Sequence, residues 1–222
     1  MSLTLYYHPL SSFCMKVLIA LYENKTPFTP QIVDLMDEAA AANLKKMWPI
    51  RKFPVLRDDA KNQTIPETSI IIEYLDQHYP GTTRFIPADN ALALQTRLQD
   101  RFYDLYVQLP MQQIVGDRLR PADKKDPLGV AQAKDRLTNV YEIIENDMAG
   151  HSCAVGDEFS MADCAAAPAL FYANKVMPLT DDHRNVRAYL DRLMQRPSFA
   201  RVLQEAQPYF KFFPQESERK SA

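Results

Sequence analysis

Hydrophobic positions in the first 80 residues alternate between strand-like and helix-like spacing. Predicted strands, rich in β-branched and aromatic residues, cover 3–7, 29–35, 55–56 and 64–65. Predicted helices cover residues 14–21, where one apolar face recurs at helical spacing, and then 37–47 and 69–78. The order βαβ followed by ββα indicates an α+β domain in this part of the chain.

After residue 90 the spacing is helical only. Apolar side chains recur every three or four residues at Leu98, Phe102, Leu105 and Leu109. The run Phe159–Asp163 predicts a helix start, in which Ser160 caps the helix and Asp163 reaches back to it. The run Arg196–Ser198 predicts the end of one helix and the start of the next. Between the two patterns lies a proline- and glycine-containing segment. We therefore expect an α+β domain over 1–80, a linker over 81–89 and an all-helical domain over 90–222.

Composition narrows the functional classes. The chain has 222 residues and a net charge of −2, so it has no global positive field to hold nucleic acid or an anionic membrane. No apolar run is long enough to span a bilayer, and the N-terminus lacks a signal-peptide pattern. Three cysteines, an odd number, argue against a disulfide framework and favour a reducing, cytoplasmic setting. The four histidines show no metal-ligand spacing, so no metal is expected.

Two serines, Ser11 and Ser12, lie between the first strand and the first helix. A helix start presents free N–H groups and the positive end of the helix dipole, which together favour an anion. A serine in this position is also an ordinary N-cap, so the position alone does not establish a site. Cys14 shares an apolar helix face and is expected to be a core residue. Ser11-x-x-Cys14 has the spacing of a CxxC motif without its first cysteine, which argues against dithiol chemistry.

Three short motifs, in order, resemble those of the cytosolic glutathione transferase family. They are Ser11–Cys14, Lys52–Val55 and Pro66–Thr68, with the helix start at 160–163 as a fourth. The resemblance covers nearly the whole chain and is closest to the serine-using theta, delta and zeta classes, although a separate bacterial class stays open. It implies a thioredoxin-like N-terminal domain and a helical-bundle domain that lines a hydrophobic substrate pocket.

The resemblance also assigns expected roles to residues of the first two motifs. Ser11 would donate a hydrogen bond to the thiolate of glutathione, with Ser12 as a helper or a cap. Phe53 would pair through its backbone with the cysteinyl part of the tripeptide, ahead of a cis Pro54. Lys52 would meet the glycine carboxylate.

In the third motif, the resemblance implies that Thr68 holds the γ-glutamyl carboxylate at a helix start, while Glu67 accepts from the ammonium group. Arg51 departs from the family pattern, which usually has glycine there. Tyr6 and Tyr7 lie on the first strand, where tyrosine-using family members keep their donor, so a tyrosine donor stays open as an alternative.

The expected activity is conjugation of glutathione, as co-substrate, to a small hydrophobic electrophile. A zeta-like isomerase or a dehalogenase is an alternative within enzymes. A glutathione-binding stress or interaction protein without catalysis is an alternative outside them. The resemblance further implies a homodimer.

Overall fold

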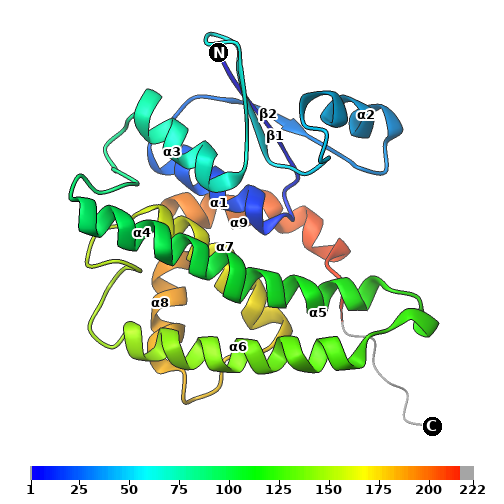
Figure 1. The fold of residues 1–222 in the computed structure, drawn as a ribbon, viewed down its shortest axis with the longest axis vertical. Coiled ribbons are helices and arrows are strands. Elements are labelled where there is room, and N and C mark those ends of the chain that lie inside the picture. The colour runs from blue at the N-terminus through cyan, green and yellow to red at the C-terminus, as the bar shows by residue number, and fades with distance from the viewer. Residues whose placement is uncertain (1, 216–222) are drawn as a thin grey trace.

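A four-stranded mixed sheet forms the first part of the molecule, in a computed structural model that describes residues 2–215 (Figure 1). The strands are β1 (Leu3–Tyr7), β2 (Thr29–Ile32), β3 (Val55–Asp58) and β4 (Gln63–Pro66). Their order in the sheet is β2-β1-β3-β4, with β1 parallel to β2 and the other pairs antiparallel. The helices of this part are α1 (Ser12–Glu23), α2 (Glu38–Met47) and α3 (Thr68–His78). The predicted βαβ–ββα order is confirmed.

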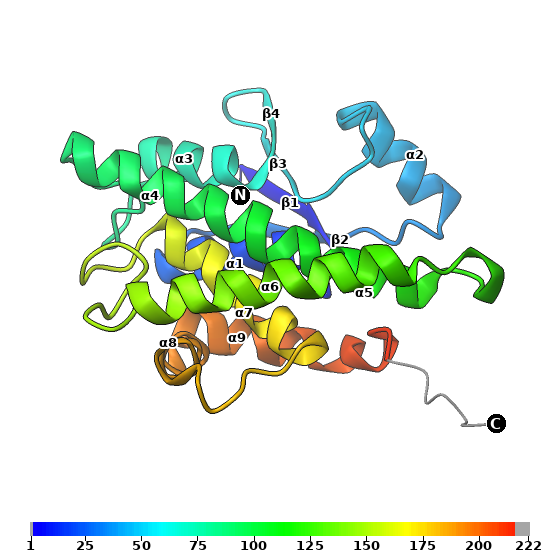
Figure 2. The ribbon, with the colours of Figure 1, turned by 60° about the horizontal axis from the view of Figure 1, so that its bottom comes forward.

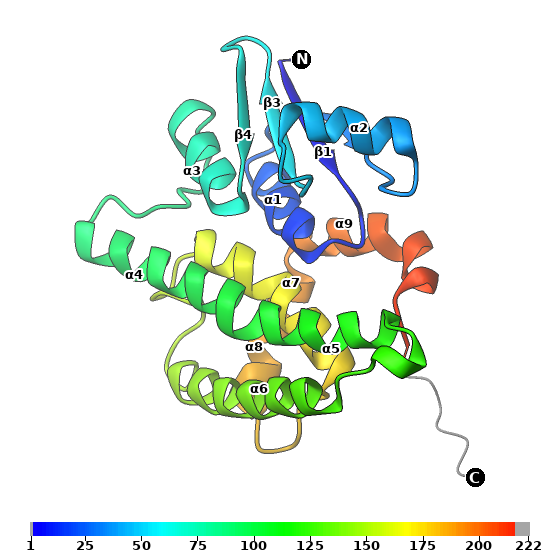
Figure 3. The same ribbon diagram turned by 45° about the vertical axis from the view of Figure 1, so that its right-hand side comes forward.

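Alternate side chains of the strands enter two separate cores. Leu3, Leu5 and Tyr7 of β1 pack in the main core, together with the apolar residues of α1 and α3. Val55 instead packs with Leu44 of α2 in a small second core on the opposite face. The sheet therefore lies between α2 on one side and α1 with α3 on the other, as Figure 3 shows.

Strand β2 is shorter than the predicted run of residues 29–35, because it ends at Ile32. The backbone N–H of Val33 still bonds to the carbonyl of Tyr7 at 2.8 Å. The side chain of Asp34 then accepts from the N–H of Met36 at 2.8 Å, which turns the chain out of the sheet. The predicted strand is too long because apolar residues continue past Ile32 into the turn made by the side chain of Asp34 (an Asx turn).

The rest of the described chain is helical, which confirms the predicted fold class. Its elements are α4 (Asn90–Phe102), a π-helical turn η1 (Tyr103–Gln108), α5 (Leu109–Leu119), the 3-10 turn η2 (Ala122–Lys124), α6 (Pro127–Asp147), α7 (Met161–Val176), α8 (Arg184–Gln195), α9 (Pro197–Ala206) and the 3-10 segment η3 (Gln207–Phe212). In Figure 2, α4 and α5 cross in front of α7, and α6 runs alongside α5.

Helix α7 is the centre of this part. Its residues are buried almost throughout, and it packs against α1 as well as against α4, η1 and α8. The predicted capping box is confirmed: Ser160 accepts from a first-turn N–H, and the carboxylate of Asp163 accepts from the N–H of Ser160 at 2.9 Å. The predicted stop and restart near Pro197 is confirmed as well, because α8 ends at Gln195 and α9 begins at Pro197.

The π-helical turn η1 has a cause in the sequence. Pro110 has no N–H to give to the carbonyl four residues earlier, and its ring crowds that position. The preceding N–H, that of Leu109, bonds to the carbonyl of Asp104, five residues back. One extra residue is thereby accommodated between α4 and α5.

The apolar face that the spacing of α4 predicts does not face the core. Leu98 is 63% exposed, and Leu105 and Leu109 are also exposed. The buried face of the same helix carries Thr96 and Asp100, and Tyr103, Val107 and Met111 continue it beyond the helix. Spacing identified the helix correctly, but polar residues occupy part of its inner face.

Candidate active site

Ser11 is the N-cap of α1. Its backbone is extended, and its Oγ accepts from the N–H of Cys14 at 3.3 Å. The first turn of α1 has no acidic residue to compensate the positive end of the helix dipole. The side chain of Ser11 is half-buried. A partly accessible hydroxyl therefore stands at a helix start that favours a negative charge.

Ser12, the next residue, has a different environment. It is buried, and its Oγ accepts a short hydrogen bond from the side-chain amide of Gln108. Gln108 is the last residue of η1, so this bond joins the first helix of the sheet domain to the helical part. The two adjacent serines thus have different partners.

Cys14 is a core residue, as expected. It has no exposed surface, and its sulfur receives the N–H of His8 at 3.4 Å. Burial raises the pKa of the Cys14 thiol to about 12, against the opposing effect of the Ser11 hydroxyl. The thiol is therefore neutral at physiological pH and is a poor nucleophile.

The loop before β3 contains a cis peptide bond between Phe53 and Pro54, which confirms the expected isomer. Pro54 is buried, Phe53 is half-buried and Lys52 is exposed. Arg51, in the position where the family usually has glycine, adopts a φ of 58°. The loop thus has at Arg51 the left-handed backbone that glycine favours.

Glu67 connects β4 to α3 and adopts a φ of 70°. Its side chain is exposed and makes no cap on α3, while Thr68, the first residue of that helix, is buried. The first turn of α3 has no acidic residue. A non-glycine residue with positive φ at this point is the kind of local strain that clusters at functional sites.

A buried ionic cluster, which the sequence analysis missed, joins the two helix starts. Lys16 of α1 is 1% exposed, and its Nζ lies 2.6 Å from Asp100 and 2.8 Å from Asp104. The same Nζ donates to the Oγ of Ser69 at 3.1 Å, and Ser69 donates to Asp100 at 2.6 Å. Ser69 follows Thr68, so the cluster fixes the first turn of α3 relative to α1.

Signals for this cluster are present in the sequence. A lysine stands within the apolar run of the first helix, and Asp100 and Asp104 are four residues apart on another. Burial raises the pKa of Asp104, and Lys16 opposes that shift.

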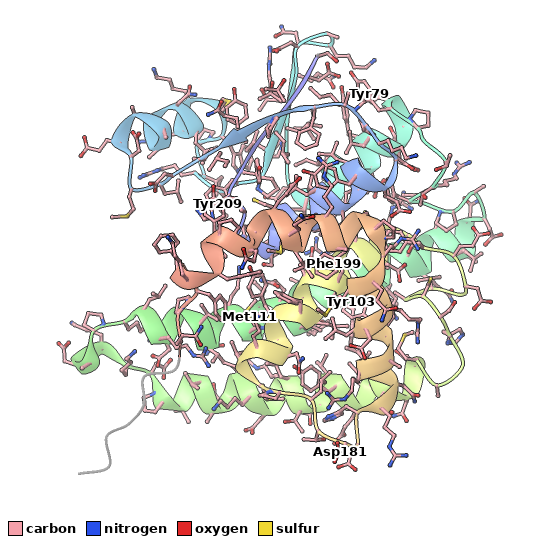
Figure 4. All side chains as sticks on the ribbon, turned by 180° about the vertical axis from the view of Figure 1, so that it is seen from behind. Tyr79, Tyr103, Met111, Asp181, Phe199 and Tyr209 are labelled. Carbon is pink, nitrogen blue, oxygen red and sulfur yellow. The ribbon has the colours of Figure 1, made fainter. Side chains whose placement is uncertain are left out.

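Helix α7 and the C-terminal turn η3 both contact the loop that carries Ser11. The hydroxyl of Tyr172 on α7 donates to the carbonyl of Leu10 at 2.9 Å. The ring of His8 lies 6.1 Å from that of Phe53 and 5.8 Å from that of Tyr209. Figure 4 shows Tyr209 on η3, between the end of α9 and the sheet. Elements from both ends of the chain therefore surround this loop.

The positions of three other tyrosines and of two surface hollows give less support for a site. Tyr7 packs in the main core, and burial raises its pKa. Tyr103 is buried, whereas Tyr106 is exposed. Two surface hollows, of about 380 Å³ beside Asp89 and about 350 Å³ beside Asp191, include none of the predicted site residues.

Two broader findings apply to the part of the chain that the structure describes. No group of three or more His, Cys, Asp or Glu side chains there could hold a metal ion. No helix there is both long enough and apolar enough to cross a bilayer.

Two family models match this chain. The N-terminal domain of glutathione S-transferase matches residues 5–83, and the C-terminal domain of glutathione S-transferase matches residues 102–197. The chain therefore belongs to the glutathione S-transferase family, in agreement with the motifs and the fold.

Individual relatives are distant but span the chain. A probable maleylacetoacetate isomerase of Caenorhabditis elegans is 28% identical over 92% of this chain and 94% of its own. A stringent starvation protein A homolog of Histophilus somni is 22% identical over 93% and 92%. The crystal structure of a glutathione S-transferase from Methylobacillus flagellatus, with glutathione bound, superposes with a TM-score of 0.83 at 22% identity, over 90% of this chain and 98% of that one. At 22% identity, the likeness to this crystal structure shows a shared fold.

Proposed function

We propose that this protein is a glutathione transferase, which ionises the thiol of glutathione at the start of α1 and transfers it to a small hydrophobic electrophile. The observation that carries this proposal is the half-buried hydroxyl of Ser11 at an uncompensated helix start. The cis Phe53–Pro54 loop and the strained start of α3 support it, because a bound tripeptide needs holding at more than one point.

The energetics are sufficient without a general base. A free thiol has a pKa near 8.5, and lowering it by about two units requires about 2.7 kcal/mol. One hydrogen bond to a charged acceptor contributes roughly 1.5–3 kcal/mol, and a helix dipole contributes roughly 0.3–1 kcal/mol. Together they reach the required value.

Ser11 is the better candidate for the thiolate donor. Ser12 is buried and already accepts from Gln108, so its proposed part is to hold α1 against η1. In the same proposal, Phe53 presents its backbone to the cysteinyl part, and the exposed Lys52 meets the glycine carboxylate. The further proposed contacts, at the γ-glutamyl end, are with Glu67 and Thr68. A tyrosine donor from β1 remains the alternative that a Tyr7→Phe variant tests.

A second reaction within the same chemistry has support from one relative. The C. elegans protein is named as a probable maleylacetoacetate isomerase, so addition of glutathione followed by its elimination is the runner-up. The alternative outside enzymes is a glutathione-binding stress protein without turnover, and one relative is named for stringent starvation.

The proposed assembly is a homodimer. Ile70 on α3 and Leu94 and Leu98 on α4 are exposed apolar side chains. Arg97 of α4 bonds Glu73 of α3 through two contacts of 2.9 Å, so the two helices form one continuous surface there. Exposed apolar area of this kind is typical of interfaces. The three free cysteines support a reducing compartment, and we propose the cytoplasm.

Calorimetry with glutathione, combined with ultraviolet absorbance of the bound thiolate, tests the function. We expect binding by the wild type and ionisation of the bound thiol near neutral pH. Ser11→Ala should retain binding and lose most of the thiolate signal, whereas Ser12→Ala, as the matched control, should keep both. An absence of glutathione binding would refute the proposal. Thiolate formation that survives in Ser11→Ala but not in Tyr7→Phe would move the role to the tyrosine.

A further inference from the structure

His8 occupies the turn that positions Ser11. It directly follows β1, and its carbonyl accepts from the N–H of Ser11 at 3.0 Å. Its own N–H donates to the sulfur of Cys14 at 3.4 Å. The backbone of His8 is thereby fixed to the first turn of α1, three residues before the proposed thiolate donor.

Hydrogen bonding selects one tautomer of the His8 ring. Nδ1 accepts from the N–H of Leu10 at 3.2 Å, so in the neutral ring the proton resides on Nε2. Within residues 2–215 no group is hydrogen-bonded to that Nε2. Burial lowers the pKa of His8, against the opposing influence of Asp34, which favours the neutral ring at neutral pH. Among the described residues, this single N–H donor therefore has no hydrogen-bond partner.

Rings from two different elements hold this imidazole in place. Phe53 stacks on it at 6.1 Å with an interplanar angle of 23°. Tyr209 of η3 meets it edge-on, at 5.8 Å and 75°. Phe53 precedes the cis proline whose loop we propose binds the cysteinyl part of glutathione. The imidazole thus lies against the ring of the residue whose backbone we propose binds the cysteinyl part, and its two aromatic neighbours are suited to a hydrophobic substrate.

We propose that the Nε2–H of His8 is a further catalytic group, which donates a hydrogen bond to an oxygen acceptor of the electrophile. This inference rests on the proposed transferase function and specifies its substrate class as enones and related carbonyl-activated electrophiles. In the step, the thiolate attacks the β-carbon and the C–S bond forms. The π electron pair moves to the carbonyl oxygen, where His8 stabilises the enolate. A proton from water then adds to the α-carbon, which replaces the proton that the thiol lost, and no oxidant is needed.

Two variants separate the donor from the ring. His8→Phe keeps an aromatic ring and loses the N–H, whereas His8→Gln loses the ring and keeps an amide donor near the position of Nε2. We compare kcat/KM for but-3-en-2-one, which has a carbonyl oxygen, with that for 1-iodobutane, which has no hydrogen-bond acceptor of this kind. We expect His8→Phe to lose about tenfold or more with the enone and less than about twofold with the iodide. His8→Gln should recover much of the enone rate. The inference would be overturned if His8→Phe lost kcat/KM equally with both electrophiles, or if His8→Phe kept the enone rate while His8→Gln lost it.

A binding measurement decides the matter even where turnover is slow. S-(3-oxobutyl)glutathione and S-butylglutathione differ by one carbonyl oxygen, and calorimetry gives their affinities. We expect the wild type to prefer the ketone severalfold and His8→Phe to lose that preference. The same preference in both proteins, or none in the wild type, would overturn the role of His8 and leave the transferase proposal intact. If neither conjugate binds the wild type, the transferase proposal itself fails.

Discussion

Lys16→Met is expected to be among the most destabilising single substitutions in this chain. The wild-type ammonium is 1% exposed and lies 2.6 and 2.8 Å from two buried carboxylates. Removal of one partner from a buried ion pair costs about 3–5 kcal/mol, because the remaining charge is left without compensation. Here Asp100 and Asp104 would both be left behind. Arg101 offers limited relief, since it is 3.5 Å from Asp104 but half exposed.

Unfolding in urea, followed by circular dichroism, measures this loss. We expect a fall of about 3–5 kcal/mol in the free energy of unfolding, which corresponds to about 6–20 °C in Tm for a chain of this size. Arg201→Met is the matched control, because it also removes a positive charge but breaks an exposed pair with Glu205 within α9. It should cost less than about 1 kcal/mol.

A compensating variant tests the cause. If the loss comes from uncompensated charge, then Lys16→Met combined with Asp100→Leu and Asp104→Leu should recover most of it, because an apolar replacement of a whole buried ionic cluster is often neutral. A loss below about 1 kcal/mol in Lys16→Met, or no recovery in the triple variant, would refute the reasoning.

The loss of stability in Lys16→Met should also depend on pH. Burial raises the folded-state pKa of Asp104 above its ordinary value of 3.8, and Lys16 opposes that shift. A carboxyl group whose pKa is higher in the folded than in the unfolded state contributes stability below its unfolded-state pKa. That contribution is lost as the pH rises through its folded-state pKa. Without Lys16 the folded pKa of Asp104 rises further. The stability difference between wild type and Lys16→Met should therefore narrow as the pH is lowered from neutral towards 3.8, and a constant difference would contradict this account.

Three further predictions concern other contacts. Glu23→Gln should lose about 1–2 kcal/mol at neutral pH, because it weakens the contacts of 2.5 and 2.9 Å with Arg196. Burial alone would raise the pKa of Glu23, but these hydrogen bonds hold it below the ordinary value of 4.5. The stability difference between Glu23→Gln and wild type should therefore vanish when the pH falls below the folded-state pKa of Glu23, which an acid titration of stability measures. Ser12→Ala should cost about 1–3 kcal/mol in urea unfolding, because the buried amide of Gln108 loses its acceptor. Leu98→Glu should convert a dimer to monomers in sedimentation experiments with the fold intact, and a monomeric wild type would contradict the proposed assembly.

Local signals in the sequence predicted much of the fold. The capping box at Ser160 and the restart at Pro197 each depend on a few neighbouring residues, and each is confirmed. The cis bond before Pro54 is instead implied by the family resemblance, and it is confirmed as well. Periodicity also located the helices correctly. It failed on α4, where Leu98 faces outward while Asp100 faces inward, because the buried carboxylate is satisfied by a lysine 84 positions earlier.

The candidate site divides in the same way. The positions of Ser11 and Thr68 at helix starts follow from local sequence, and the structure places both there. The contacts of Ser12 with Gln108 and of His8 with Tyr209 join residues about 100 and 200 positions apart. Spacing along the chain carries no information about such pairs, because they depend on how the helical part packs on the sheet.

The alanine-rich character of α7 has a consequence for how this protein can change over evolutionary time. Helices surround α7 so closely that its six alanines, at 162, 165, 166, 167, 169 and 173, leave no room for larger side chains. Substitution by larger side chains is therefore excluded along α7, and sequence change is expected on the outer parts of the molecule instead. The exposed Tyr106 can vary without disturbing α7, so new substrate preferences of the proposed transferase are expected to arise there first.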